Sequence, residues 1–231
     1  MDKIDCVVFD FDDTLYDYEN LNKNCLEQVF KDISRVFDID YERIVSNYKI
    51  VKKECEVVTL NHNKLVYFIK LFKNLSLPLH LAVRYHKDYE ELFYSSIVLF
   101  DKCLIFIQYL YLNKIKIIIL TNNTIENTIN KLEKLNIIQF IHSVVTSDIV
   151  GFEKPDPNIY DYLFKLLEIY KVQCPVFIGD NYKNDIKPFI DRGFRAFLKT
   201  DYIIDELHTD KFSNYESLLL RFKIDYNIKY I

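Results

Sequence analysis

Short apolar segments rich in β-branched and aromatic residues recur along the chain and predict the strands of a sheet. The first is Cys6-Val7-Val8-Phe9, which is followed directly by acidic residues. Uninterrupted apolar runs of this length are typical of strands in a parallel sheet whose two faces are both covered. The predicted strands cover residues 6–9, 115–120, 143–146, 176–178 and 195–198.

Helical patterns of apolar residues separate the later strands. They cover residues 124–136, 158–170 and 184–192. Strands that alternate with helices in this way are typical of βαβ units. The pattern therefore predicts an α/β fold with a doubly wound parallel sheet.

Residues 16–100 break the alternation, because their apolar residues recur at helical spacing and no convincing strand occurs among them. We expect a helical insert that packs its own core and lies over the carboxyl end of the first strand. Residues 1–15 and 101–231 then form the catalytic core. The apolar positions that share predicted helix faces are Leu21, Cys25, Val29 and Phe30, then Leu65, Phe68, Ile69 and Phe72, then Leu81, Tyr85, Tyr89 and Phe93.

Composition narrows the class of protein. The 231 residues are 50% hydrophobic and 28% charged, which suits one large domain or one domain with an insert. A net charge of −4 offers no basic surface for nucleic acid or membrane, and no feature indicates an obligate protein partner. Five widely spaced cysteines without a C-x-x-C pair favour a reducing compartment. With no signal-peptide pattern and no apolar run long enough to span a bilayer, we expect a cytoplasmic protein.

Asp10 and Asp12 follow the first predicted strand directly. Ligands of open α/β sheets bind beyond the carboxyl ends of the strands. There one carboxylate can attack a substrate while the other transfers protons. Acidic residues also commonly end a strand or cap a helix. This motif alone leaves both interpretations open.

A second acidic cluster, with Asp180 and Asp185, follows the strand predicted at 176–178. Both clusters should reach the same edge of the sheet, where four carboxylates without a cation would repel one another. Magnesium prefers oxygen ligands, usually one or two carboxylates with water and substrate phosphate. The two clusters together predict a magnesium site with Asp10 and Asp180 among its ligands.

Two further features lie between the acidic clusters. Thr121 and Asn122 follow the second predicted strand and precede a helix, where a hydroxyl and free backbone N–H groups can bind an anion. Lys154 precedes Pro155 in a loop stiffened by proline. An isolated threonine or lysine in a loop usually has no catalytic role. Thr121 and Lys154 become candidates for one because they occur in order between the two acidic clusters.

The motifs that contain these residues occur in the order D-x-D-x-T, a strand-end threonine, a lysine before proline, and G-D-x-x-x-x-D. From Asp10 to Asp185 the chain thereby resembles the haloacid dehalogenase (HAD) superfamily. The resemblance implies a Rossmann-like core with the nucleophile strand at its centre. It also implies a helical cap inserted between the first and second motifs.

The resemblance assigns a role to each residue of the first motif. Asp10 is the nucleophile, forms a phosphoaspartate and binds magnesium. Asp12 is the general acid and base, and its backbone carbonyl also reaches the metal. Thr14 braces the loop, and Asp13 receives no catalytic role.

The remaining motifs receive roles in the same way. Thr121 and Lys154 hold the phosphoryl oxygens with Asn122 beside them, and Lys154 also offsets the charge near Asp10. Asp180 binds magnesium. Asp185 supports the metal site through a water molecule or by contact with the residues that bind the metal.

The resemblance implies a magnesium-dependent phosphohydrolase that acts on a small phosphorylated metabolite, such as a nucleoside monophosphate or a sugar phosphate. Haloacid dehalogenases of the superfamily lack an acid at the position of Asp12 and need no magnesium, so Asp12 favours hydrolysis of a phosphate ester. The insert residues that could meet a substrate are Tyr16, Tyr18, Arg43, Lys52, Lys53, Arg84 and His86.

Three alternatives stay open: a phosphomutase of the same superfamily, a phosphoacceptor signalling domain, and a member that has become a binding protein. Phosphoacceptor domains usually lack both a helical insert and an acid two residues after the nucleophile. Dinucleotide binding is poorly supported, because no G-x-G-x-x-G follows the first strand.

Overall fold

The computed structural model describes residues 4–56, 63–202 and 209–226. The chain divides into two compact units, which we call the sheet unit (Met1–Asp17 with Val98–Ile231) and the helical unit (Tyr18–Ile97). The sheet unit includes Tyr16, Asp17 and residues 98–100, for which the sequence pattern predicts a place in the insert.

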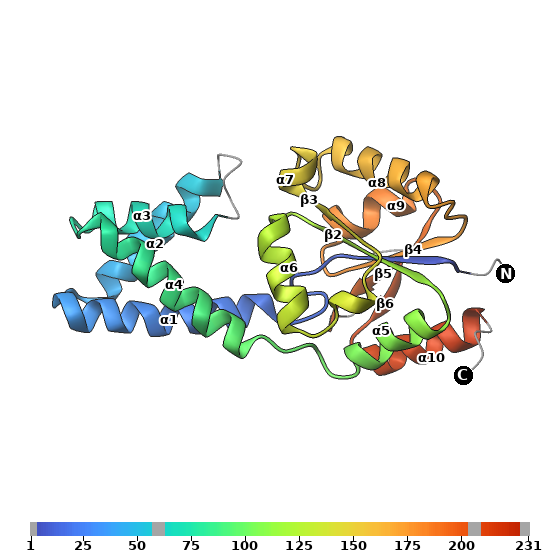
Figure 1. The fold of residues 1–231 in the computed structure, drawn as a ribbon, viewed down its shortest axis with the longest axis horizontal. Coiled ribbons are helices and arrows are strands. Elements are labelled where there is room, and N and C mark those ends of the chain that lie inside the picture. Colours follow the sequence, from blue (N-terminus) through green and yellow to red (C-terminus); the bar gives the residue numbers. More distant parts are fainter. Residues whose placement is uncertain (1–3, 57–62, 203–208, 227–231) are drawn as a thin grey trace. The chain divides into compact units, whose positions relative to one another are not determined.

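The sheet unit contains a six-stranded sheet with the strand order β3-β2-β1-β4-β5-β6 (Figure 1). Every neighbouring pair is parallel. The predicted α/β fold with a doubly wound parallel sheet is confirmed. The strands are β1 (Cys6–Phe9), β2 (Lys116–Thr121), β3 (Ser143–Thr146), β4 (Pro175–Gly179), β5 (Arg195–Lys199) and β6 (Asp210–Phe212).

The first strand lies in the middle of the sheet, between β2 and β4. Its last residue, Phe9, is level with Ile119 of β2 and Ile178 of β4. Since the three strands are parallel and in this register, the residues that follow them meet at one edge. The order of the strands thus brings Asp10, Thr121 and Asp180 to the same edge of the sheet.

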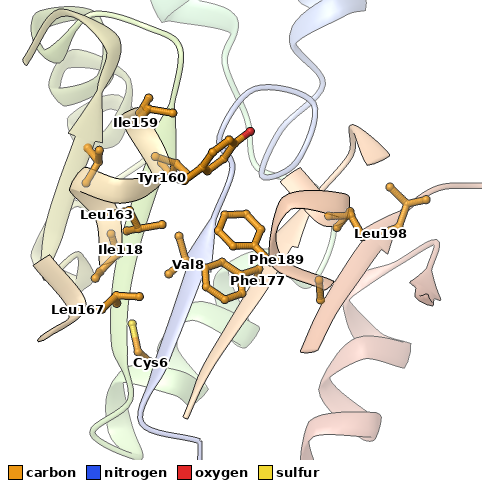
Figure 2. Packing of buried hydrophobic residues seen from close by; sticks show 14 residues of the cluster. Cys6, Val8, Ile118, Ile159, Tyr160, Leu163, Leu167, Phe177, Phe189 and Leu198 are labelled. Carbon is orange, nitrogen blue, oxygen red and sulfur yellow. The ribbon is translucent and has the colours of Figure 1, made fainter. Parts of the chain in front are cut away.

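One face of the sheet is covered by α8 (Pro157–Ile169) and α9 (Lys187–Ile190). Side chains of alternate strand positions, such as Cys6 and Val8, pack there with apolar residues of the two helices (Figure 2). The rings of Phe177 and Phe189 stack with centroids 3.6 Å apart. This packing fixes the segment that follows β4, which carries Asp180 and Asp185.

The opposite face is covered by α5 (Cys103–Leu112) and α10 (Tyr215–Tyr226) (Figure 1). The ring of Phe106 in α5 lies 6.1 Å from that of Phe9 and 4.9 Å from that of Phe222. Helices on both faces explain why β1 and β4 are buried at every position. The pattern of apolar residues did not predict α5, α10 or β6.

The remaining helices of the sheet unit are short. They are α6 (Ile125–Lys134), a 3₁₀ turn η1 (Ile138–Phe140), α7 (Ser147–Val150) and a π-helical turn η2 (Tyr182–Ile186). The single helix predicted for residues 184–192 is wrong in detail, because the structure divides it into η2 and α9. Pro188 explains the division, since proline has no N–H to donate and is accepted only in a first helical turn.

The helical unit consists of α1 (Tyr18–Phe37), α2 (Tyr41–Glu56), α3 (Lys64–Asn74) and α4 (Leu79–Ser96). Its core is aromatic: the ring of Phe72 lies 5.5 Å from that of Tyr85, and the ring of Phe30 lies 5.0 Å from that of Tyr48. The prediction of a helical insert after the first strand is confirmed. In the described ranges of the chain, no helix is both long and apolar enough to cross a membrane.

Candidate active site

Asp10 lies at the carboxyl edge of the sheet, one residue beyond β1. Its backbone N–H donates to the carbonyl of Ile178 at 2.8 Å, so the strand pairing extends as far as this residue. Its Oδ2 accepts a hydrogen bond from the Thr14 hydroxyl at 2.8 Å, and its Oδ1 accepts one from Lys154 Nζ at 2.7 Å. The Asp10 carboxylate is therefore held on both oxygens.

Lys154 is buried at the centre of the site. Its Nζ donates to Asp10 Oδ1, to Asp185 Oδ1 at 2.6 Å and to the carbonyl of Leu120 at 3.1 Å. Burial acts to lower the pKa of this ammonium group, but the carboxylates of Asp10 and Asp185 outweigh it and hold the pKa above its usual value. Lys154 is thus a permanent positive charge between two acids.

The side chain of Asn122 fixes the backbone on which Lys154 stands. Its Oδ1 accepts from the Lys154 N–H at 2.6 Å, and its Nδ2 donates to the Lys154 carbonyl at 2.9 Å. This pair of bonds explains how a loop residue can be placed accurately. The predicted role of Asn122 in holding phosphate stays a prediction, since both of these side-chain bonds go to Lys154.

The segment after β4 brings Asp185 back against Gly179, the last residue of that strand. The backbone N–H of Asn181 donates to Asp185 Oδ2 at 3.1 Å. Gly179 makes the close approach possible, because a Cβ atom at this position would lie 2.3 Å from the Cβ of Asp185. Thr14 links the two clusters further, since its hydroxyl also lies 3.3 Å from Asp180 Oδ1.

Asp10, Asp180 and Asp185 form a group that can hold a metal ion, with one carboxylate oxygen from each within 4.8 Å of the others. Removal from water, followed by the charges of Asp10 and Asp185, raises the pKa of Asp180 to about 8. Burial likewise raises the pKa of Asp185 to about 6, although Lys154 opposes this. One lysine therefore does not neutralise the cluster, and the all-oxygen donor set fits magnesium.

The Asp12 carboxylate is engaged by a different set of residues. Its Oδ1 accepts from Lys131 Nζ at 2.8 Å and from the Tyr16 hydroxyl, and its Oδ2 accepts from Asn123 Nδ2 at 3.3 Å. The contact of Asp12 with magnesium was predicted through its backbone carbonyl and stays a prediction. The two acids of the first motif thus have separate surroundings.

Thr121 ends β2 and is buried. Its Oγ1 accepts a hydrogen bond from the backbone N–H of Asn123 at 3.2 Å, at the turn that leads into α6. The α6 helix begins with a cap in which the Thr124 side chain accepts from the N–H of Asn127. Thr121 therefore lies beside the start of a helix, as its sequence position predicts, and its bond to phosphate stays a prediction.

Three residues with clear places in the site were missed or underrated. Thr14 was expected to brace the loop, and its hydroxyl in fact touches the carboxylates of both acidic clusters. Tyr215 of α10 donates to the carbonyl of Thr14 at 2.8 Å. Lys131 reaches Asp12 from α6. The sequence could have pointed to Lys131, because this residue falls on the same predicted helix face as Thr128 and Leu135. No local pattern points to Tyr215.

All of these residues belong to the sheet unit. A model of the haloacid dehalogenase-like hydrolases matches residues 4–191 of the chain. A comparison with curated protein sequences found no similar protein.

Solved structures share the fold over nearly the whole chain. YfnB from Bacillus subtilis, a HAD-hydrolase whose structure is bound to magnesium, has a TM-score of 0.73 and 20% identity and covers 98% of this chain and 100% of its own. A HAD phosphatase from Thermococcus onnurineus has a TM-score of 0.71 and 19% identity, with coverage of 99% and 100%.

A 2-haloacid dehalogenase from Pseudomonas syringae pv. Tomato has a TM-score of 0.66 and 19% identity, with coverage of 94% and 98%. Such identities establish a shared fold and leave the reaction open, because phosphatases and dehalogenases both match. The match over residues 4–191 establishes the family: this chain belongs to the haloacid dehalogenase-like hydrolases.

Proposed function

We propose that the protein is a magnesium-dependent phosphohydrolase that cleaves a small phosphorylated metabolite, with Asp10 as the nucleophile. The observation that carries the proposal is the separate placement of two acids only two residues apart. Asp10 lies among Lys154 and the acids that can hold a metal, whereas the Asp12 carboxylate is held by Lys131, Tyr16 and Asn123. One acid is arranged for attack and the other for proton transfer.

In the first step, an oxygen of Asp10 forms a bond to phosphorus while the bond from phosphorus to the leaving oxygen breaks. Asp12 gives its proton to that leaving oxygen. Lys154 stabilises the charge that develops on the phosphoryl oxygens, together with the Thr121 hydroxyl. Magnesium, when bound by Asp10, Asp180 and Asp185, supplies positive charge that offsets the repulsion between carboxylate and phosphate.

In the second step, water attacks the phosphorus of the phosphoaspartate. Its proton passes to Asp12, the bond between Asp10 and phosphorus breaks, and inorganic phosphate leaves. The proton taken from water replaces the one that Asp12 gave to the leaving oxygen. YfnB, which shares the fold, binds magnesium, and this supports the assignment of the metal.

The test is the release of inorganic phosphate from an aryl phosphate with and without magnesium. We expect turnover that requires magnesium and that falls by roughly 10³-fold or more in Asp10→Asn. Asp191→Asn is the matched control, because it removes a carboxylate of the same unit from an exposed pair with Lys187. Phosphate release that Asp10→Asn leaves intact contradicts the proposal.

Three other outcomes identify the alternatives. Release of halide from a 2-haloacid without magnesium assigns a dehalogenase. Stable phosphorylation of Asp10 without turnover assigns a phosphoacceptor. Transfer of phosphate between two hydroxyls of one sugar, with little free phosphate, assigns a phosphomutase.

A further inference from the structure

Lys131 is a buried lysine in the inward-facing part of α6. Only 4% of its surface is exposed, whereas lysines are rarely buried unless their charge is paired. Its Nζ lies 2.8 Å from Asp12 Oδ1, 5.7 Å from the ring centroid of Phe11 and 5.5 Å from that of Tyr16. The ammonium group is thus stabilised by contacts with the Asp12 carboxylate and with the rings of Phe11 and Tyr16. Lys131 is therefore a buried part of the site and is not a surface charge.

The contact joins residues 119 positions apart in the chain. Lys131 lies outside all four motifs of the sequence analysis, so none of them accounts for it. Its partner Asp12 accepts a second bond on the same oxygen from the Tyr16 hydroxyl. Two donors on Oδ1 fix the plane and the rotamer of the carboxylate more firmly than either could alone.

The helix that carries Lys131 is itself held in place. Asp148 accepts the backbone N–H of Ile125 at the start of α6 through both carboxylate oxygens, at 3.0 and 3.1 Å. Thr128, one turn before Lys131, is buried and donates its hydroxyl to the carbonyl of Thr124 at 2.7 Å. Lys131 can therefore act as a fixed point against which Asp12 is oriented.

We propose that Lys131 is a positioning residue, which together with Tyr16 holds the Asp12 carboxylate in the orientation for proton exchange with the leaving group and with water. The inference rests on the proposed phosphohydrolase activity and deepens it. Lys131 contributes to the reaction through its contact with the Asp12 carboxylate, which transfers the proton.

The leaving group makes the inference testable. An alkyl phosphate has a basic leaving oxygen that needs a proton from Asp12, whereas an activated nitrophenyl phosphate needs little help. The value of kcat/KM reports the first phosphoryl transfer in both cases. Lys131→Met keeps the length of the side chain and removes the charge, and Lys134→Met is the control on an exposed position of the same helix.

With saturating magnesium, we expect Lys131→Met to lower kcat/KM by roughly 10-fold or more for alkyl phosphates and by less than about 3-fold for the activated ester. Lys131→Arg should restore most of the loss, and Lys134→Met should behave as wild type. In an Asp12→Asn background, Lys131→Met should cost nothing further. An equal loss for all leaving groups, or an undiminished loss without Asp12, overturns the inference.

Should Lys131→Met fail to fold, Tyr16→Phe removes only the second donor on the same oxygen and must show the same dependence on the leaving group. If Tyr16→Phe shows no such dependence on the leaving group, the inference is also overturned. If the wild-type protein releases no phosphate, the proposed function fails. If the wild type turns over through Asp10 and Lys131→Met has no selective effect, only the role of Lys131 fails.

Discussion

The Nζ atom of Lys154 lies 2.7 Å from Oδ1 of Asp10, and both groups are largely withdrawn from solvent. Breaking a buried pair from one side leaves a charge without compensation. We therefore expect Lys154→Met to abolish turnover and also to lower the free energy of unfolding by about 3–5 kcal/mol. Urea unfolding in the absence of magnesium measures the second effect.

Lys187→Met is the control for this experiment. Lys187 and Asp191 form a pair of the same kind at 2.6 Å, but both side chains are more than half exposed. Such a pair contributes at most about 1 kcal/mol. Equal losses of stability in the two variants would mean that the buried charges near Asp10 do not depend on Lys154.

The acidic cluster predicts how magnesium and pH act together. The pKa of Asp180 is raised to about 8, so in the metal-free protein the folded chain holds this proton more tightly than the unfolded chain does. The stability that this proton contributes is complete below the ordinary pKa of 3.8 and is lost as the pH rises towards 8. Magnesium replaces the proton, so it should stabilise the protein more at pH 8 than at pH 5.5.

Thermal unfolding with magnesium or with a chelator across pH 5.5–8.5 measures this dependence. At magnesium concentrations about 100-fold above Kd, the stabilisation should approach about 2.7 kcal/mol. Asp180→Asn should flatten the response to pH. A magnesium effect that is largest at acid pH would refute the site.

Replacement of Gly179 should damage the metal site through steric overlap alone. A methyl group there would lie 2.3 Å from the Cβ and 2.7 Å from the Cγ of Asp185. We expect Gly179→Ala to cost about 1–3 kcal/mol of stability and to weaken magnesium binding, because Asp185 must move. Calorimetric titration with magnesium measures the binding.

Gly151→Ala separates shape from backbone strain. Gly151 has φ of 82°, so alanine is strained there, but nothing lies within 4 Å of the added Cβ. This variant should lose roughly 1 kcal/mol of stability and keep its affinity for magnesium. If both glycine variants bind magnesium normally, the placement of Asp185 does not matter for the metal.

Asn122→Ala distinguishes two roles for this side chain. If its bonds to the backbone of Lys154 are its main contribution, kcat should fall while KM stays nearly constant, and stability should drop by about 1–3 kcal/mol. If Asn122 binds the phosphate of the substrate, KM should rise. Steady-state kinetics with an aryl phosphate decides between them.

The secondary structure followed from the sequence wherever the local pattern was strong. The apolar run Cys6–Phe9 has too few residues for a buried helix and ends in acids, so it predicted β1 correctly. The segment that forms α5 is apolar on all sides and shows no helical period, and β6 has only three residues with one buried. Neither carried a pattern that could be read from local sequence.

The sequence by itself determined the fold class, the place of the helical insert, and the order in which Asp10, Thr121, Lys154 and Asp180 follow their strands. These properties are local, because they depend on the period of apolar residues and on what ends each strand. Only the tertiary structure decided which side chains touch: Thr14 reaching Asp10 and Asp180, and Lys131 reaching Asp12. Such contacts depend on the packing of a helix against a sheet edge, and spacing along the chain does not encode that packing.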